Sequence, residues 1–460
     1  MICCIEAMNL KHFENIRRHY INKAAFNYEY IFAALFFSKI DCMKVFKFGG
    51  ASLNSVERIQ NVANILKNYS DQPLIVIMSA MGKTTNALEK VVEAFYRGNK
   101  DEALRLFELI KQNHLTTAKF LLVTSYNATL DDLTAFFTEV EWLLHDNPIQ
   151  SFDYYYDQIV CVGELLGSRI VSAYLNEKGI TNRWFDVRDI IRTDNTFREA
   201  NIDWPVTKGN LIRSNVVNTP ALYITQGFIG STDQNESTTL GREGSDYTAA
   251  IFANLLEAHD LTIWKDVEGV MSADPKLFPS ASLISDLSFN EVIEMAFYGA
   301  HVIHPKTIKP LQNKKIPLHV KSFLDPSLQG TIISNKAIKS LPPVIVIKNN
   351  QVLVHLQSQD FSFLEERLMG TLYHLFAELN IKPNLIQTAA INLQVCLDDR
   401  QDKIEHLAAM ASEIFDVQLE KNLTLLTIRH YTEDLLTEML QQKDMVLMQK
   451  TKETVQMLYR

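Results

Sequence analysis

The stretch "MKVFKFGGASLNSVERI", residues 43–59, joins a β-strand to a helix through two adjacent glycines. Its first part has the β-rich composition of a strand, and apolar residues recur at helical spacing in its second part. Lys47 lies near the end of the strand, beside Gly49 and Gly50, whose N–H groups can face an anion. Two interpretations stay open on this stretch alone: a ligand-binding loop, and an ordinary strand–turn–helix with a solvated lysine.

Strands and helices alternate along residues 43–335. The continuous apolar run at 73–80 is typical of a buried parallel strand, and residues 86–148 have an almost wholly helical pattern. Further strands are expected at 181–187, 221–230, 260–267 and 317–322, and further helices at 55–69, 157–178, 245–257 and 289–298. This order predicts an α/β fold with a mostly parallel sheet and with ligands at the carboxyl ends of the strands.

The sequence pattern changes at "KSLPPVIV" (339–346), where two prolines favour a stiff linker. Beyond it, residues 344–460 predict two α+β modules with a regulatory or dimerising role. The expected elements are strand pairs at 344–357 and 383–397, helices at 362–379, 401–414 and 432–442, and strands at 422–430 and 444–459.

The composition excludes several classes of function. The 460 residues carry a formal net charge of −9 and no basic block, which argues against a nucleic-acid partner. The five cysteines form no CxxC pair, so we expect reduced thiols in a cytoplasmic protein without disulfides or zinc. His301 and His304 lack a nearby third ligand, so no metal site is predicted.

Residues 1–42 are interpreted as a poorly ordered N-terminal extension, with the functional domain beginning at Met43. The apolar run at 30–40 is only about half as long as a bilayer span requires. No clean small-residue cleavage site follows it, which argues against a signal peptide. A short amphipathic membrane contact is the alternative for this segment.

A second loop candidate, "MSAMGKTTN" (78–86), follows the apolar run at 73–80. Its GKT triplet is not part of a Walker A loop, because that motif requires a glycine where this sequence has Ile77. The hydroxyl groups of Ser79, Thr84 and Thr85 instead suit a polar small molecule.

A third glycine-containing turn, "TTLGREGSDYTAA" (238–250), opens an apolar helix. Arg242 suits bidentate binding of a carboxylate, and Ser245 is a reasonable N-cap at a helix end that can hold an anion. Asp246 has two interpretations: a favourable interaction with the helix dipole, or a carboxylate that holds a catalytic cation in place.

Two further stretches complete the set. "VGELLGSRI" (162–170) places Glu164 on an otherwise apolar helix, where a carboxylate is unfavourable unless it is partnered, so a ligand ammonium group is a candidate. "WKDVEGVMSADPKLF" (264–278) ends a strand with Lys265 and Asp266, before a loop that could seat a nucleotide or merely turn. Together these stretches offer cations for phosphates, an arginine for a carboxylate and a glutamate for an amine. This set predicts a site that binds an amino acid beside a nucleoside triphosphate.

Eight motifs occur in the order and spacing of a known family: "KFGGAS", "SAMGKTTN", "GELLGSR", "WFDVRDIIRTD", "ITQGFIGS", "TTLGREGSDYTAA", "WKDVEGVMSADP" and "MAFYGAHVIHP". On these motifs the sequence resembles the aspartate kinases of the amino acid kinase family over about residues 43–335. The tail resembles the paired ACT modules of that family.

The resemblance implies an open αβα sandwich with a mostly parallel central sheet, the amino acid kinase fold, followed by C-terminal α+β ACT-like modules. It implies that Mg-ATP phosphorylates the β-carboxylate of L-aspartate, giving 4-phospho-L-aspartate and ADP on the route to lysine, threonine and methionine. The expected partners are L-aspartate, ATP with Mg2+, an amino-acid effector at the ACT-like region, and further copies in a homodimer or higher homo-oligomer. Nucleic acid and membrane are not expected partners.

The resemblance also implies residue roles. Lys47 and Asp246 are the expected catalytic residues, Lys47 stabilising the phosphoryl charge and Asp246 orienting nearby lysines. The residues expected to bind aspartate are Ser79, Ala80, Thr85, Glu164, Phe228, Arg242 and Ser245. The residues expected on the nucleotide side are Lys47, Gly49, Gly50, Lys265, Asp266, Met271, Lys276 and His301.

The sequence departs from the family pattern in both regions. The departures are Ala51 for Thr, Glu243 for Gly, Lys265 for Thr or Ser, Met271 for Tyr, Lys276 for Arg, His301 for Lys, and Asn384 and Ala389 for Asp and Ser.

Two alternatives therefore stay open. One is another amino acid kinase, such as a glutamate kinase, against which Glu164 and the ACT-like tail speak. The other is a catalytically weakened amino-acid sensor on the same fold.

Overall fold

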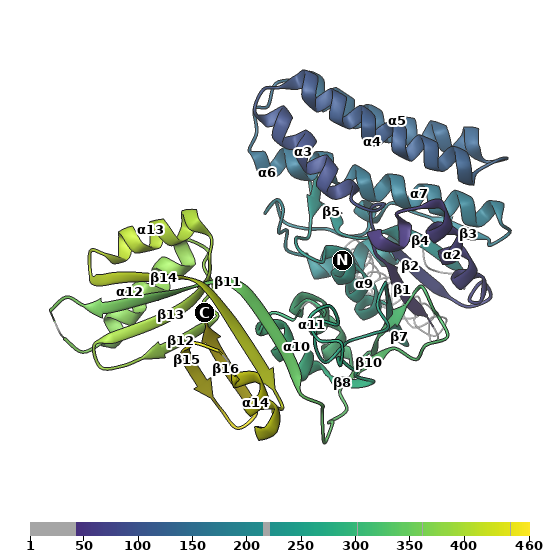
Figure 1. The fold of residues 1–460 in the computed structure, drawn as a ribbon. Coiled ribbons are helices and arrows are strands. Elements are labelled where there is room, and N and C mark those ends of the chain that lie inside the picture. Colours follow the sequence, from purple (N-terminus) through teal and green to yellow (C-terminus); the bar gives the residue numbers. More distant parts are fainter. Residues whose placement is uncertain (1–42, 215–220, 301, 361, 442) are drawn as a thin grey trace, which may run out of the picture. The chain divides into compact units, whose positions relative to one another are not determined.

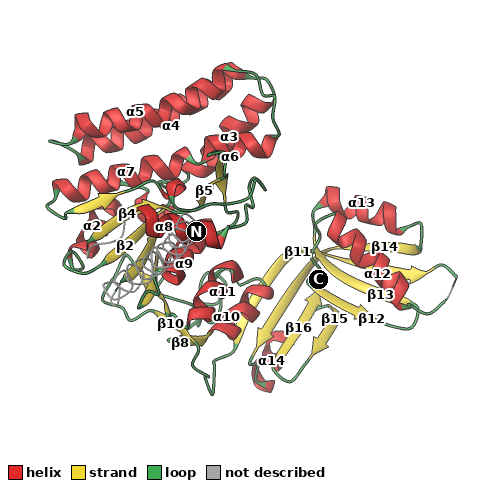
Figure 2. Cartoon of the chain, turned by 180° about the vertical axis from the view of Figure 1, so that it is seen from behind, coloured by secondary structure: helices red, strands yellow, loops and turns green. Residues whose placement is uncertain are grey.

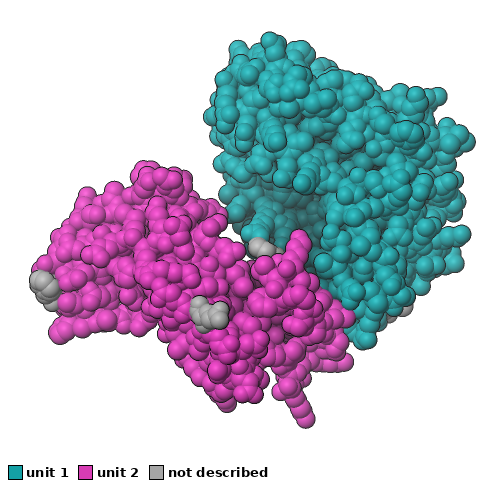
Figure 3. All heavy atoms as spheres, in the orientation of Figure 1, with its two compact units in different colours: residues 1–269, 303–335 teal, residues 270–302, 336–460 magenta. Residues whose placement is uncertain are grey.

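The computed structural model describes residues 43–460, except 215–220, 301, 361 and 442 (Figure 1). The chain forms two compact units: unit 1 comprises residues 1–269 and 303–335, and unit 2 comprises residues 270–302 and 336–460 (Figure 3). The expectations for residues 1–42 and for His301 fall outside the described residues. The domain limits that we predict from the sequence, 43–335 and 344–460, stay a prediction.

A mostly parallel sheet forms the centre of unit 1. Its strand order in this unit is β3-β4-β2-β1-β7-β9-β10, and neighbouring strands are parallel except for β9 and β10. The strands are β1 (Lys44–Phe48), β2 (Leu74–Met78), β3 (Asn182–Trp184), β4 (Leu222–Gln226), β7 (Asp260–Lys265), β9 (Leu318–Ser322) and β10 (Thr331–Ser334). Both β2 and β4 are buried along their whole length, as expected for parallel strands covered on two faces.

Helices cover both faces of this sheet (Figure 2). On one face, α9 (Gly244–Leu255) packs on β1, β2 and β7 and contacts α11 (Pro305–Lys314). Helices on the other face share one apolar core with Phe46, Phe48, Val76 and Met78. They are α2 (Val56–Lys67), α3 (Thr84–Tyr96), α4 (Lys100–Leu121), α5 (Tyr126–His145), α6 (Phe152–Val160) and α7 (Val162–Glu177). The αβα sandwich and the helical insertion at 86–148 are confirmed.

The segment Phe152–Glu177, which comprises α6 and α7, is long and apolar enough to cross a membrane by length and composition alone. However, 89% of its 18-residue window is buried inside the fold. The apolar side chains of this segment therefore pack in the core of unit 1.

The predicted strand at 221–230 is wrong as a single element. It forms β4 and then β5 (Ile229–Ser231), which pairs with β6 (Ser237–Thr239) in a separate hairpin. The chain turns between β4 and β5 at Phe228, whose φ of 73° is incompatible with a continuous strand. Two helices of unit 1, α8 (Trp204–Ser214) and α11, were not expected.

Unit 2 is built on a six-stranded antiparallel sheet with the order β12-β13-β11-β14-β16-β15. Its strands are β11 (Val344–Ser358), β12 (Leu385–Thr388), β13 (Asn392–Asp398), β14 (Phe415–Arg429), β15 (Met445–Lys450) and β16 (Thr454–Tyr459). The helices α12 (Glu366–Glu378) and α13 (Gln401–Ala411) share an apolar core with alternate residues of β11 and β13. The remaining elements are β8 (Asp286–Ser288), α10 (Phe289–Phe297) and α14 (Glu433–Leu440).

The predicted strand pair at 344–357 is wrong, because β11 is one strand of 15 residues. The pair Asn349–Asn350 has the composition of a hairpin turn, but the register with β14 shifts between Lys348 and Gln351 instead. Asn350 takes up the irregularity with a φ of 54°. The two expected modules therefore share a single sheet, through β11 and its long neighbour β14.

Candidate active site

The carboxyl ends of β1, β2 and β4 lie side by side at one edge of the sheet of unit 1. Their register pairs Phe48 with Met78, and Met78 with Gln226. The loops that follow stay in contact, because Ser79 N–H donates to Phe48 O (3.1 Å) and Gly227 N–H donates to Met78 O (2.8 Å). Parallel strands thus bring together loops that are far apart in the sequence.

Lys47 and Asp246 form an ion pair at this edge. Lys47 Nζ lies 2.6 Å from Asp246 Oδ1, and their side chains are 12% and 3% exposed. Burial by itself would raise the pKa of Asp246, but the ammonium groups of Lys47 and Lys265 hold that pKa below its usual range. The carboxylate in the first turn of α9 therefore stays ionised and holds the lysine of β1, which is the geometry of a cation-positioning role.

The two glycines after β1 allow a close approach of backbone segments. A Cβ on Gly50 would lie 2.6 Å from Gly82 O and 2.9 Å from Ala80 O, which no side chain can occupy. Gly82 N–H also donates to Gly50 O at 3.0 Å. A Cβ on Gly49 would lie 3.3 Å from Lys47 Nζ, so the ammonium group lies directly over this turn. The glycines, the lysine and the loop after β2 form one packed group.

Glu164 is a buried carboxylate of α7 next to the same group. It is 3% exposed, and its Oε2 has no hydrogen-bond partner among the described residues. Burial raises the pKa of Glu164 to about 8, although Lys47 and the N–H of Ala80 oppose the shift. Gly163 permits the close packing, because a Cβ there would lie 3.3 Å from Ala80 Cβ. A buried carboxylate oxygen without a partner fits a ligand ammonium group.

The loop after β4 crosses the start of α9. A Cβ on Gly227 would lie 2.5 Å from Ser245 Cβ, and one on Gly244 would lie 2.6 Å from the ring of Phe228. Phe228 N–H donates to Thr248 Oγ1 at 3.0 Å, which fixes the crossing. Gly227 is a structural part of this site that our sequence prediction did not include; its only signal is a glycine directly after an apolar strand.

The remaining residues expected to bind aspartate occupy the surrounding loops. Ser79 is half-buried after β2, and a Cβ on Gly167 of α7 would lie 3.2 Å from its carbonyl oxygen. Thr85 lies half-buried in the first turn of α3, and Arg242 lies exposed on the loop before α9. The structure thus gathers Ala80, Glu164, Phe228 and Ser245 by direct packing, and it places Thr85 on α3 and Arg242 on the loop before α9.

Glu243 adopts a left-handed conformation with a φ of 55°, at a position where the family pattern has glycine. Its Oε2 accepts a hydrogen bond from His304 N–H at 2.8 Å, and His304 is the N-cap of α11. The carboxylate is therefore stabilised by the start of a helix, where negative charge is favourable. This contact offsets part of the backbone strain energy that a non-glycine residue has at this φ.

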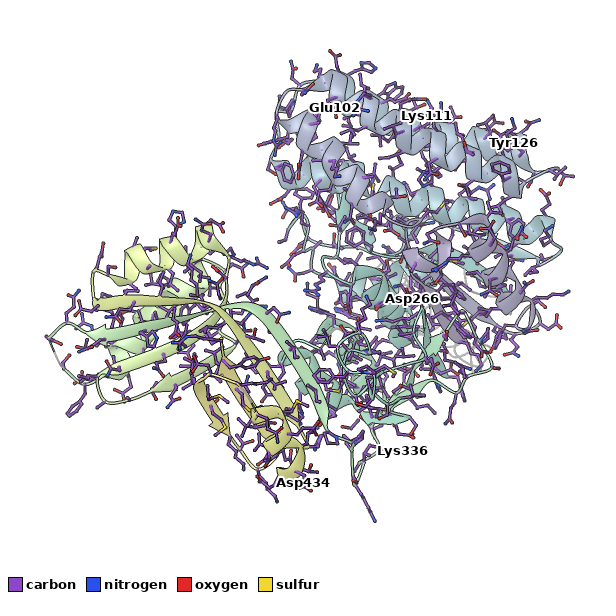
Figure 4. All side chains as sticks on the ribbon, viewed as in Figure 1. Glu102, Lys111, Tyr126, Asp266, Lys336 and Asp434 are labelled. Carbon is purple, nitrogen blue, oxygen red and sulfur yellow. The ribbon has the colours of Figure 1, made fainter. Side chains whose placement is uncertain are left out.

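Residues expected on the nucleotide side fall in both units. Lys265 is half-buried at the end of β7 and acts electrostatically on Asp246, and Asp266 follows it on an exposed loop (Figure 4). In unit 2, Met271 forms an isolated bridge with Leu283, and Lys276 is exposed. Lys47, Gly49, Gly50 and Lys265 thus supply cations and N–H groups within unit 1.

Within the described ranges, no group of three or more His, Cys, Asp and Glu side chains has the arrangement of a metal site. Mg2+ usually binds through substrate phosphates and water with only one or two carboxylates. The two lysines and the glycine turn fit the phosphates themselves.

Residues 43–322 match the model of the Amino acid kinase family. The chain is 30% identical over 408 residues to Aspartokinase 1, chloroplastic, of Arabidopsis thaliana, which covers 84% of this chain and 70% of that protein.

Solved structures give the same picture. E. coli aspartokinase III in complex with aspartate and ADP (R-state) matches with a TM-score of 0.77 and 27% identity, over 91% of this chain and 96% of that chain. The complex of E. coli aspartokinase III with lysine and aspartate (T-state) matches with a TM-score of 0.75 and 26% identity, over 90% of this chain and 95% of that chain.

Proposed function

The chain belongs to the aspartokinases of the amino acid kinase family, and from this premise we propose that it transfers the γ-phosphoryl group of ATP to the β-carboxylate of L-aspartate. The products are 4-phospho-L-aspartate and ADP. One observation carries the proposal: the buried Lys47–Asp246 pair lies within electrostatic reach of Glu164, a buried carboxylate with an oxygen that lacks a partner in the described part of the chain.

Aspartate is recognised through its charged groups. Glu164 offers a carboxylate for the α-ammonium group, and the α-carboxylate suits the guanidinium of Arg242, which can bind both oxygens. Ser245 lies in the first turn of α9, where backbone N–H groups favour an anion. With its α-carbon groups held in this way, the substrate directs its β-carboxylate toward Lys47.

The transfer needs little covalent chemistry from the protein. A β-carboxylate oxygen attacks the γ-phosphorus, the new O–P bond forms, and the bond to the β,γ-bridging oxygen breaks so that ADP leaves with that electron pair. The attacking carboxylate is already ionised at neutral pH, so no general base is required. Lys47 stabilises the charge on the transferred group, and Asp246 holds the ammonium in place.

ATP would be bound as its Mg2+ complex, in which the ion would supply charge neutralisation at the phosphates. Lys47 and Lys265 are the protein cations on the same side of the site, and both act on Asp246. Lys265 stands where the family pattern has Thr or Ser, so this chain holds more positive charge there.

Several features of the wider function follow from the same premise. The reaction is the first step toward lysine, threonine and methionine, in the cytoplasm, and an amino acid regulates it through the ACT-like region of unit 2. Lysine is the first effector to test, because a matching structure is of E. coli aspartokinase III with lysine. A homodimer or higher homo-oligomer is part of the same proposal.

A trapping assay tests the activity. Purified residues 43–460 are incubated with Mg-ATP, aspartate and hydroxylamine, and the aspartyl hydroxamate formed from the acyl phosphate is measured. We expect hydroxamate that depends on both substrates and is lost in Lys47→Ala. Absence of hydroxamate above the Lys47→Ala control would refute the kinase proposal and favour the sensor alternative. Adding lysine, threonine or methionine singly to the assay identifies the effector.

A further inference from the structure

Asp157 is a fully buried carboxylate of α6 that the reaction scheme does not use. Its Oδ2 accepts hydrogen bonds from the N–H groups of Arg198 (3.0 Å) and Thr239 (2.8 Å). Its Oδ1 accepts a hydrogen bond from the Thr239 hydroxyl at 2.7 Å. All three donors lie more than 40 residues away along the chain, so this side chain ties α6 to two separate segments.

One of these segments leads directly into the substrate loop. Thr239 is the last residue of β6, and the substrate loop that follows, defined as residues 240–246 and including the first turn of α9, carries Arg242 and Ser245. The neighbouring Gln158 holds the other end of β6, since its amide donates to Ser237 O (2.8 Å) and accepts from Ser237 N–H (3.0 Å). Two adjacent residues of α6 therefore fix this short strand at both ends.

The second segment borders the same loop. Ala200 N–H donates to Thr239 O at 3.0 Å, and a Cβ on Gly241 would lie 3.2 Å from Arg198 O. Arg198 itself has a left-handed φ of 69°. The N–H bond from Arg198 to Asp157 thus fixes a strained turn that packs against the first glycine of the substrate loop.

The helix that carries Asp157 leads to the opposite end of the aspartate site. Asp157 O accepts from Cys161 N–H at 3.4 Å, and Cys161 O accepts from Glu164 N–H at 3.2 Å. Glu164 is therefore connected to Asp157 through two backbone hydrogen bonds of one helical segment.

We propose that Asp157 is a positioning residue for aspartate: it holds the loop with Arg242 and Ser245 at a fixed distance from Glu164. The inference rests on the proposed function. A ligand as small as aspartate must contact both ends at once, and a displacement of about 1 Å can lower activity about 100-fold. The glycine turn after β1 is not bonded to Asp157, so binding of ATP should depend less on this tether.

Four variants separate positioning from general stability. Asp157→Ala removes all three bonds. Asp157→Asn keeps them, because its oxygen can accept from the two N–H groups and its NH2 group can donate to the Thr239 hydroxyl. Thr239→Val removes only the hydroxyl bond. Asp153→Ala is the matched control: it lies on the same helix and contacts the same arginine, but through the exposed guanidinium (3.2 Å).

The readout is KM for aspartate, KM for ATP and kcat in the hydroxamate assay, with melting temperatures measured in parallel. For Asp157→Ala we expect KM for aspartate to rise about tenfold or more and KM for ATP to change less than about twofold. Asp157→Asn and Asp153→Ala should stay within about threefold of the wild type. An equal rise in both KM values, no change in Asp157→Ala, or no recovery in Asp157→Asn would overturn the proposal.

Thr239→Val decides the matter if Asp157→Ala does not fold. A rise in its KM for aspartate without a matching rise for ATP supports the tether, and unchanged constants overturn it. The failure of the proposed function is distinct, because wild-type protein would then form no hydroxamate at any aspartate concentration.

Discussion

Lys47 Nζ lies 2.6 Å from Asp246 Oδ1, although one residue belongs to the first strand of the sheet and the other to a helix almost 200 residues later in the chain. Both side chains are largely withdrawn from solvent, so the attraction between them is weakly screened. The pair is complete without substrate, which means that the cation needs no rearrangement when the phosphoryl group arrives. Preorganised charge of this kind is a main source of catalytic power.

The first prediction is that Lys47 and Asp246 act as one unit. Asp246→Asn removes the charge that orients the ammonium group, and we expect kcat to fall by about 10²–10³. Lys47→Ala should lower kcat at least as much, and the double variant should be no worse than Lys47→Ala. Steady-state kcat values of the three variants test this, and losses that multiply in the double variant would show that the residues act independently.

The second prediction concerns pH and aspartate affinity. The pKa of Glu164, raised to about 8 mainly by burial, keeps most of the free enzyme protonated at this residue at pH 7. Only the ionised carboxylate pairs with an ammonium group, so the affinity for aspartate should increase about tenfold per pH unit from pH 6 to pH 7 and level off above pH 8.

Isothermal titration at several pH values, in buffers of different ionisation enthalpy, measures both the affinity and the proton released. Glu164→Gln provides the control, because it has no proton to release: it should bind aspartate weakly and with little dependence on pH. Wild-type affinity that is flat across this range would exclude Glu164 as the ammonium partner.

The third prediction uses the packing of Gly50. In Gly50→Ala the new methyl group would meet the carbonyl oxygens of Gly82 and Ala80 at 2.6 and 2.9 Å, so the loops after β1 and β2 must separate. We expect a loss of about 1–3 kcal/mol in stability and higher KM values for both substrates. Gly370→Ala is the matched control, since nothing lies within 4 Å of that position in α12 and alanine favours a helix by about 0.5–1 kcal/mol. Equal melting temperatures for Gly50→Ala and wild type would refute the argument.

The sequence predicted the parts of the site whose chemistry is local. A lysine followed by two glycines, and a glutamate on an apolar helix, are unusual enough in their own segments to indicate ligands. The αβα fold was predictable for the same reason, because strand and helix periodicity is local too.

Other long-range contacts, unlike that between Lys47 and Asp246, escaped prediction. Asp157 gave no signal, because its partner Thr239 lies 82 residues away and an acidic residue in an aromatic-rich helix is unremarkable. The strand pair predicted at 344–357 was wrong, because pairing with β13 on one side and β14 on the other holds β11 as one strand. The sequence also could not tell that residues 270–302, with Met271 and Lys276, belong to the same compact unit as the ACT-like sheet.

The fourth prediction concerns the effect of Asp157 on stability. Burial is the main cause that raises the pKa of this carboxyl from about 3.8 to about 6. Between these values the unfolded chain has released the proton while the folded protein still binds it, so the contribution of Asp157 to stability is complete below pH 3.8 and decreases as pH rises through 6. The loss is on the order of 3 kcal/mol.

Asp157→Asn resembles the protonated form and does not titrate. The melting temperature of this variant should therefore equal that of the wild type near pH 4 and exceed it increasingly toward pH 7, because only the wild type must bury a charge there. Comparing the two proteins at each pH removes the contribution of all other titrating groups, such as Glu291 and Asp260, whose pKa values are lowered by neighbouring cations against the effect of burial. A constant difference in melting temperature between the two proteins from pH 4 to pH 7 would contradict this prediction. It would show that the pKa of Asp157 is the same in the folded and unfolded chains, as for an exposed carboxylate.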